Sequence, residues 1–353
     1  MSHAEKHFAG LDTLRACAIL MVIPRHAREI LSRDFFGPIL KPILNAGWIG
    51  VELFFVLSGF LICSQLLQSV KKEGRVNFKR FYFKRSLRIL PSYYFVLLIY
   101  YVWPAFREHP EIDPAWRFIL FIMNYGRNGE AFSHAWSLCI EEHFYLLFPA
   151  LVALCFWKPK IFKPAVLIGG ALLGVVTLRY YLWSKGASFY PAVYRPTHTH
   201  IDGLTIGVML AVLREKKPML WSKAVSFPWA LFLGGIALVW AGVYRGFPEP
   251  FAYVWSFTFV SVGFGALVAA AMAPGFWLST AKIPGASWIA ALAFTLYLTH
   301  KQMIHLAAQV VGDYMENPTI TILLASLFIV VSACIVHYGV EKPILKLRDQ
   351  ILK

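Results

Sequence analysis

The sequence predicts an all-α protein that crosses a membrane many times, and three observations support this class. Hydrophobic residues make up 58% of the 353 residues and charged residues only 15%, whereas a soluble domain has roughly 45–50% apolar and about 25% charged residues. The mean hydropathy is +0.58. The apolar residues come in runs of about twenty, the length that one helix needs to cross a hydrocarbon core roughly 30 Å thick. These values do not fit a soluble globular protein.

Ten apolar segments separated by polar stretches predict a polytopic bundle of about ten transmembrane helices. In chain order they are Leu11–Leu31, Trp48–Leu67, Leu87–Ala105, Trp136–Phe156, Pro164–Trp183, Ile201–Leu213, Phe227–Tyr244, Phe251–Ala273, Gly285–Val311 and Thr319–Val340. A further apolar stretch, Trp116–Tyr125, is too short to cross and is expected to be re-entrant or interfacial. The ten segments and their connections take up nearly the whole chain, so we expect one membrane domain over residues 1–353.

The basic residues predict the orientation of these helices. The chain has 34 Lys and Arg against 19 Asp and Glu, a net charge of +15. Cytoplasmic segments of membrane proteins carry an excess of Lys and Arg. With the N-terminus inside, the inner segments hold 20 of these residues and the outer segments 8. We therefore expect both termini in the cytoplasm. The excess of Lys and Arg in cytoplasmic segments also explains the positive net charge of the chain, so no nucleic-acid partner is expected.

The longest basic cytoplasmic segment, Lys71–Pro91, interleaves aromatic residues with Lys and Arg. One interpretation is an anchor that lies on anionic membrane lipid. The other starts from Arg85 and Arg88, which are three residues apart and are therefore neighbours on one helical face. Two guanidinium groups on one face can grip a phosphate bidentately. This pair is thus a candidate anion site.

Ionisable residues inside the predicted helices are costly and usually functional or paired, and their depth sorts them into two levels. At a rise of 1.5 Å per residue, five acidic or imidazole side chains come to about 20 Å from the cytoplasmic surface: His26, Glu52, Glu141, Asp202 and His300. Arg15 lies at the cytoplasmic edge, the level of Arg85 and Arg88. Eleven residues, close to three helical turns, separate Arg15 from His26, so both lie on one helical face.

Two such levels suit a substrate with a charged head and a long thin arm, and acyl-coenzyme A is such a molecule. Its phosphates would stay at the cytoplasmic arginines while the arm carries the thioester to a histidine. Imidazole suits the role of general base toward a hydroxyl acceptor. A competing hypothesis is a proton-coupled secondary transporter or exporter of a sugar-like substrate, in which the same acids and histidines form a proton relay.

His143, His305 and His337 are expected to be structural, and the side chain of Lys301 can extend outward to the membrane surface. His198 and His200 lack the further ligands and supporting groups that a metal centre requires. We therefore expect no metal and no permanently bound cofactor.

These residues lie in strings that together resemble the acyltransferase-3 family of integral-membrane O-acyltransferases, and the resemblance covers essentially the whole chain. The strings, in chain order, are GLDTLRACAILMVIPRH, GVELFFVLSGFLI, KRSLRILP, HAWSLCIEEHFYLLFPAL, THIDGLTIGVMLA and FTLYLTH. The first contains Arg15 and His26, and the fourth contains Glu141. One difference is His200, which stands in the fifth string where the family pattern has Arg.

The resemblance implies a membrane O-acyltransferase of the bacterial cytoplasmic (inner) membrane, with His26 as the catalytic residue. It implies acetyl-CoA as the usual donor, and a surface polysaccharide or lipid-linked sugar as the acceptor. In this hypothesis Arg15, Arg85 and Arg88 hold the acyl-CoA, and Glu141 orients or recharges the imidazole. Four further residues shape or support the acceptor side: Glu52, Ser58, Asp202 and His300. Direct transfer to the hydroxyl and an acyl-histidine intermediate both remain open.

Overall fold

The computed structural model describes residues 9–31, 37–126, 129–244, 250–312 and 317–352, and within these ranges the chain forms helices and no β-strand. The predicted all-α class is confirmed, and each of the ten predicted segments overlaps a helix. These helices are α1 (Ala9–Leu31), α3 (Ile49–Glu73), α4 (Phe78–Val102), α6 (Trp136–Trp157), α7 (Pro164–Ser184), α8 (Asp202–Lys216), α10 (Pro228–Val243), α11 (Pro250–Ala270), α13 (Ala286–Val311) and α14 (Pro318–Val336).

Several of these helices are long and apolar enough to cross a membrane. Among the described residues, five helical stretches pass a test of length and hydropathy: Pro42–Glu73, Ser133–Trp157, Pro164–Ser184, Pro250–Ala270 and Pro318–Ile351. A sixth passes if α9 (Pro218–Val225) and α10, which are bent by 80° at their junction, form one span. Helix α8 has only 15 residues and falls below the required length. The chain is therefore a helical membrane protein, while ten crossings and the orientation stay predictions.

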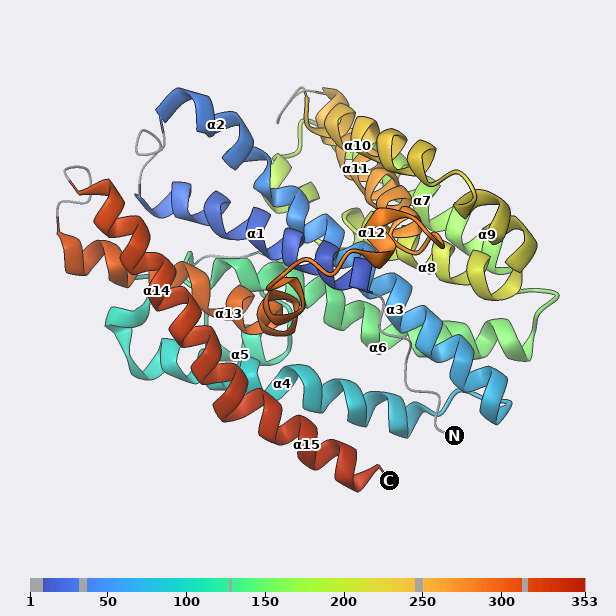
Figure 1. Cartoon of the computed structure of the whole chain (residues 1–353), viewed down its shortest axis with the longest axis horizontal. Coiled ribbons are helices and arrows are strands. Elements are labelled where there is room, and N and C mark those ends of the chain that lie inside the picture. Colours follow the sequence, from blue (N-terminus) through green and yellow to red (C-terminus); the bar gives the residue numbers. More distant parts are fainter. Residues whose placement is uncertain (1–8, 32–36, 127–128, 245–249, 313–316, 353) are drawn as a thin grey trace. The chain divides into compact units, whose positions relative to one another are not determined.

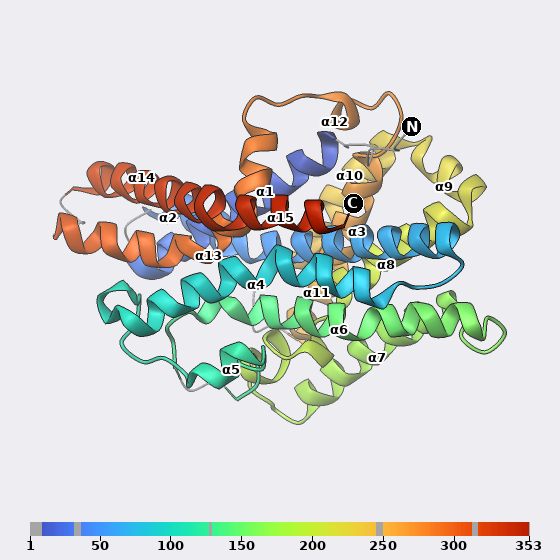
Figure 2. The ribbon, with the colours of Figure 1, turned by 90° about the horizontal axis from the view of Figure 1, so that it is seen from below.

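The chain divides into two compact units. The first unit comprises residues 1–18, 51–77 and 137–290, and the second comprises residues 19–50, 78–136 and 291–353. Helices α1, α3, α6 and α13 each contribute residues to both units. Figures 1 and 2 colour the chain by residue number. Each unit thus gathers segments that are far apart in the sequence.

Glycines allow the helices of the first unit to approach closely. A Cβ atom on Gly59 of α3 would lie 2.1 Å from the carbonyl oxygen of Leu204, and one on Gly207 of α8 would lie 2.2 Å from that of Val56. Small residues at helix contacts in membrane proteins permit this kind of backbone approach. The contact brings the start of α8 against α3. In the same unit, α10 packs along α11 (Figure 1).

In the second unit, the segment after α4 folds back onto that helix. It contains α5 (Ala115–Ile119) and a turn in which Phe121 has a φ of 55°. The Tyr93 hydroxyl on α4 donates to the carbonyl oxygen of Phe118 at 3.1 Å, and the rings of Tyr93 and Phe132 stack. With five residues, α5 is far too short to cross a membrane.

The C-terminal part of the second unit continues as one helical run. Helix α14 passes through the π-helix η6 (His337–Glu341) into α15 (Lys342–Ile351), drawn in red in Figure 1. Helix α15 and η6 both contact α4. A single π turn within a helical run is uncommon and often marks a functional site.

Candidate functional site

Three histidine rings meet in the second unit, and they come from three separate segments. His26 lies on α1, His300 on α13, and His134 in the short helix η3 (Ser133–Ala135). The Nδ1 atom of His26 lies 2.7 Å from the Nε2 atom of His300. The His134 ring is T-shaped against His300, with 5.0 Å between centroids. His300 is fully buried, His134 is 1% exposed and the His26 side chain is 16% exposed, so His26 is the accessible member.

The backbone of α13 holds this histidine cluster (His26, His134 and His300) in place. The Nδ1 atom of His300 lies 2.9 Å from the carbonyl oxygen of Tyr297 and 3.1 Å from that of Leu296. The Tyr297 hydroxyl donates to the carbonyl oxygen of His134 at 2.8 Å. One helical turn therefore holds both the ring of His300 and the backbone of His134.

Lys301 lies beside this cluster and is buried, so the expectation that it extends toward the surface is wrong. Its ammonium donates to the Ser133 hydroxyl at 2.7 Å and lies 3.7 Å from a carboxylate oxygen of Glu108. The Glu108 carboxylate also accepts hydrogen bonds from the Tyr100 hydroxyl at 2.7 Å and from the backbone N–H of Phe132 at 3.0 Å. A buried cation of this kind needs an anion nearby, and Glu108 provides it.

Sequence reasoning missed Glu108, Ser133 and His134. They lie in the connection between α4 and α6, which has no periodicity that would align them with α13. The one available signal was Lys301 itself, because an ammonium inside an apolar helix requires a counter-charge from elsewhere. Phe132, directly before this turn, has a φ of 55°, a conformation that is uncommon for a bulky residue.

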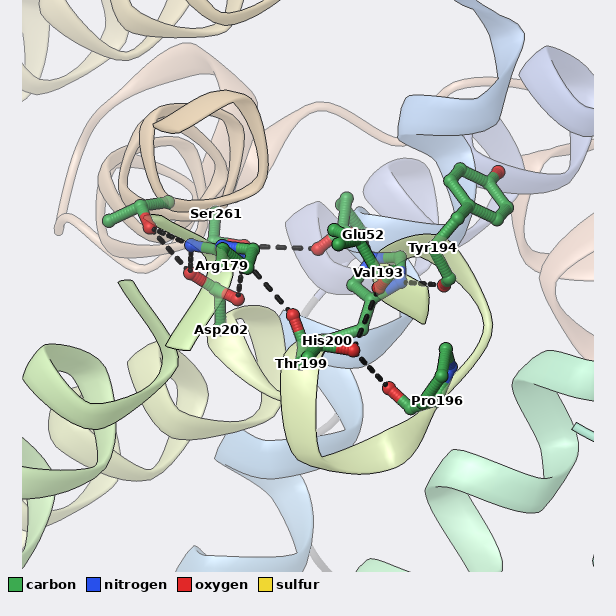
Figure 3. A network of polar contacts seen from close by, with 10 residues as sticks. Glu52, Arg179, Val193, Tyr194, Pro196, Thr199, His200, Asp202 and Ser261 are labelled. Atoms are coloured by element: carbon green, nitrogen blue, oxygen red, sulfur yellow. Dashed lines mark hydrogen bonds and ion pairs between the residues drawn. The ribbon is translucent and has the colours of Figure 1, made fainter. Parts of the chain in front are cut away.

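A polar network in the first unit contains two predicted acceptor-side residues, Glu52 and Asp202 (Figure 3). Glu52 on α3 pairs with the His200 imidazole and accepts a hydrogen bond from the Ser261 hydroxyl at 3.1 Å. Both Glu52 and His200 are fully buried. His200, which stands where the family pattern has Arg, is thus the basic partner of this carboxylate.

Arg179 of α7 neutralises the second carboxylate of that network. Its guanidinium grips Asp202 bidentately at 2.8 and 2.9 Å and donates to the carbonyl oxygen of Thr199 at 3.2 Å (Figure 3). Arg179 and Asp202 are both fully inaccessible. Sequence reasoning missed Arg179, although a lone arginine inside an apolar segment calls for a partner. The network holds the turn before α8, and an acceptor-side role for Glu52 and Asp202 stays a prediction.

Glu141 and Ser58 are joined through a buried tyrosine, also in the first unit. The Tyr145 hydroxyl donates to the Glu141 carboxylate at 2.9 Å and contacts the Ser58 hydroxyl. Because Tyr145 has only one hydroxyl proton, Ser58 must donate in the second contact. The predicted catalytic role of Glu141 and the acceptor-side role of Ser58 stay predictions.

The arginines predicted to bind the donor each have a distinct setting. Arg15 pairs with Asp12 one turn earlier on α1 at 2.9 Å, and 30% of its side chain is exposed. Arg88 on α4 lies 3.1 Å from the buried Glu341 carboxylate and is 39% exposed. Arg85 precedes Arg88 by one turn on the same helix. Arg85 and Arg88 belong to the second unit and Arg15 to the first, and their joint binding of a donor stays a prediction.

No group of three or more His, Cys, Asp or Glu side chains among the described residues is arranged to hold a metal ion. Partial burial lowers the pKa of His198, in the turn before α8, because desolvation disfavours its charged form.

Comparisons with known proteins identify the family. The family described as "Acyltransferase domain" matches residues 8–339. The chain is 27% identical to the putative peptidoglycan O-acetyltransferase YrhL of Bacillus subtilis, over 98% of this chain and 56% of that protein. It is also 27% identical to the peptidoglycan O-acetyltransferase OatA of Listeria monocytogenes, over 89% of this chain and 52% of that protein.

A putative O-acetyltransferase of Staphylococcus aureus, SACOL0978, is 31% identical over 59% of this chain and 35% of its own length. The chain spans about half the length of the first two relatives. No solved structure matches it. The family match over nearly the whole chain confirms the resemblance of the six strings, and the chain belongs to the acyltransferase-3 family.

Proposed function

We propose that this protein transfers an acetyl group from cytosolic acetyl-CoA to a hydroxyl group of a cell-surface polysaccharide or lipid-linked sugar. The observation that carries the proposal is the 2.7 Å contact between His26 and His300, which leaves the other nitrogen of a partly accessible imidazole available for chemistry. Family membership and relatives named as peptidoglycan O-acetyltransferases support acetyl transfer to a glycan.

The proposed arrangement has ten crossings of the bacterial cytoplasmic membrane with both termini in the cytoplasm. The donor phosphates bind at the cytoplasmic arginines Arg15, Arg85 and Arg88, since guanidinium groups grip phosphate bidentately. The partial exposure of Arg15 and Arg88 supports this assignment. The pantetheine arm then extends toward His26 and carries the thioester with it.

The proposed reaction needs one base and releases free coenzyme A. The acceptor hydroxyl gives its proton to His26 while its oxygen forms a bond with the thioester carbonyl carbon. The tetrahedral intermediate collapses with breakage of the carbon–sulfur bond, and the leaving thiolate takes the proton back from the imidazolium. Glu141 is proposed to orient or recharge the imidazole, and Glu52, Ser58 and Asp202 to shape the acceptor side.

A covalent route through an acetyl-histidine is an equally valid form of this chemistry. It differs from direct transfer in one measurable respect, because the acetyl group would accumulate on the protein before any acceptor arrives. Rapid denaturation of the purified protein after incubation with radioactive acetyl-CoA, in the absence of acceptor, distinguishes the two routes.

The test of the proposed function uses purified protein in proteoliposomes with labelled acetyl-CoA. We expect hydrolysis or transfer of the label, abolished in His26→Ala and retained in His198→Ala, a partly exposed histidine outside the cluster. Uptake of a labelled sugar without any acetyl-CoA consumption would contradict the proposal and favour a transporter. Comparing cell-surface glycans with and without the gene would identify the acceptor by the loss of one acetyl group.

A further inference from the structure

We propose that His300 is a positioning residue that fixes the tautomer of His26, so that the Nε2 atom of His26 is the one that accepts the hydroxyl proton. The inference rests on the proposed function and assigns His300 to the base rather than to the acceptor side. It depends on the hydrogen-bond donors and acceptors around the two rings.

The Nδ1 atom of His300 must carry a hydrogen. It lies 2.9 Å from the Tyr297 carbonyl oxygen and 3.1 Å from the Leu296 carbonyl oxygen. A carbonyl oxygen can only accept, so a ring nitrogen at this distance from two carbonyls is a donor. In a neutral imidazole one nitrogen is protonated and the other is not. The Nε2 atom of a neutral His300 is therefore an acceptor.

The contact between the two rings then has only one direction. The Nε2 atom of His300 lies 2.7 Å from the Nδ1 atom of His26, and two unprotonated nitrogens would repel at this distance. His26 therefore donates its Nδ1–H to His300. A neutral His26 that carries its hydrogen on Nδ1 has a free electron pair on Nε2, the form that a general base requires.

The surroundings of His300 favour its neutral form. His300 is fully buried, and within the described residues it makes no ion pair with a carboxylate. The neighbouring residue is Lys301, whose ammonium is itself buried and paired with Glu108. A charged imidazole at position 300 would add a second buried cation next to the first, and burial without a partner strongly disfavours a charge.

The other nitrogen of His26 is placed for reaction. Its Nε2 atom makes no hydrogen bond within the described part of the chain, and it lies 3.9 Å from a carboxylate oxygen of Glu29. Glu29 is 42% exposed and pairs with Arg25 at 2.7 Å. A carboxylate at this distance favours the imidazolium once the proton has arrived. The pair of His26 and His300 thus resembles a catalytic triad, in which a buried partner orients the base.

The first test measures the tautomer directly and uses no substrate. Nitrogen NMR of histidine-labelled protein in proteoliposomes distinguishes protonated from unprotonated ring nitrogens. The chain has 11 histidines, so the His26 signals are identified as those missing from His26→Asn. We expect an unprotonated Nε2 and a protonated Nδ1 in His26. A protonated Nε2 in neutral His26 would overturn the inference, whatever the outcome of any transfer assay.

The second test separates positioning from packing. His300→Gln keeps an amide oxygen that can accept from His26, whereas His300→Leu keeps bulk but no acceptor. We expect His300→Leu to lower kcat by about 100-fold or more, the usual scale of general-base catalysis, with little change in KM for acetyl-CoA. We expect His300→Gln to recover most of that loss. His305→Gln, the same change on the same helix outside the cluster, serves as the matched control.

Two kinetic outcomes would overturn the inference. One is a His300→Leu variant that keeps the kcat of wild type. The other is an equal loss of kcat in the Gln and Leu variants. Either result would mean that kcat does not depend on a hydrogen-bond acceptor at position 300. Failure of the proposed function has a different signature. A wild-type protein that transfers no acetyl group, but has the expected His26 tautomer, would refute the acetyltransferase and leave the hydrogen-bond assignment standing.

Discussion

The guanidinium of Arg88 on α4 lies 3.1 Å from the carboxylate of Glu341, a buried residue in the π turn between α14 and α15. The same carboxylate accepts a hydrogen bond from the Nδ1 atom of His337 at 2.7 Å. Glu341 therefore fixes one end of an arginine whose side chain is still 39% exposed. A guanidinium has five N–H donors, so Arg88 can keep its carboxylate and still meet a phosphate.

Arg88→Ala is expected to raise KM for acetyl-CoA by about tenfold, the effect of losing one charge-assisted contact. It also leaves Glu341 without its cation, so the variant loses stability as well. The double variant Arg88→Ala with Glu341→Gln removes that uncompensated charge. We expect it to regain thermal stability but not the low KM, as measured by thermal unfolding and donor titration. Lys79→Ala, an exposed change on the same helix, is the control, and a KM that recovers with stability would contradict a donor contact.

The ion pair between Lys301 and Glu108 holds the connection between α4 and α6 against α13. This connection contains His134. Lys301→Met leaves the Glu108 carboxylate buried without its cation, and breaking a buried pair in this way costs about 3–5 kcal/mol. We expect reduced thermal stability and a lower kcat, since Ser133 next to His134 loses its ammonium donor. The double variant Lys301→Met with Glu108→Gln is expected to be more stable than the single one. If the single variant has the stability and kcat of wild type, the ion pair does not hold the segment around His134 in place.

The Arg179–Asp202 pair is predicted to be a structural requirement of the first unit. Both partners are fully inaccessible, so Arg179→Met leaves an unpaired buried carboxylate and costs about 3–5 kcal/mol. Replacing both partners by Arg179→Met and Asp202→Leu is expected to restore much of the stability. Thermal unfolding of the purified variants measures this, with Lys185→Met, an exposed change after α7, as control. A double variant as unstable as the single one would contradict this prediction. The loss of stability would then come from the missing ion pair and not from an unpaired carboxylate.

Gly59 lies at a close approach between α3 and α8. A Cβ atom there would lie 2.1 Å from the backbone oxygen of Leu204, so Gly59→Ala forces the two helices apart. We expect a loss of about 1–3 kcal/mol or more, the range for overpacking a close contact. Gly234→Ala on α10 is the matched control, because nothing lies within 4 Å of its added Cβ. That change should be neutral or stabilise the helix by about 0.5–1 kcal/mol. Equal thermal stability of both variants would contradict the close approach.

The sequence alone determined the helical class and the family. Apolar runs of about twenty residues predicted the helices, because a helix that crosses a membrane needs a run of that length. Helices α7 and α14 begin and end within a few residues of the prediction. The six strings were specific enough to predict the family, which the comparison confirms. Helical rise also placed His26 and His300 at one depth, and the structure shows their rings in contact.

The tertiary structure decided which side chains pair. Depth along a helix is a property of one segment, whereas a hydrogen-bonding partner depends on how that helix is rotated and packed against others. Five residues of equal expected depth therefore have different partners: His26 and His300 meet each other, Glu52 meets His200, Asp202 meets Arg179, and Glu141 meets Tyr145. Lys301 turns inward for the same reason, because Glu108 comes from a connection whose path only the folded chain defines.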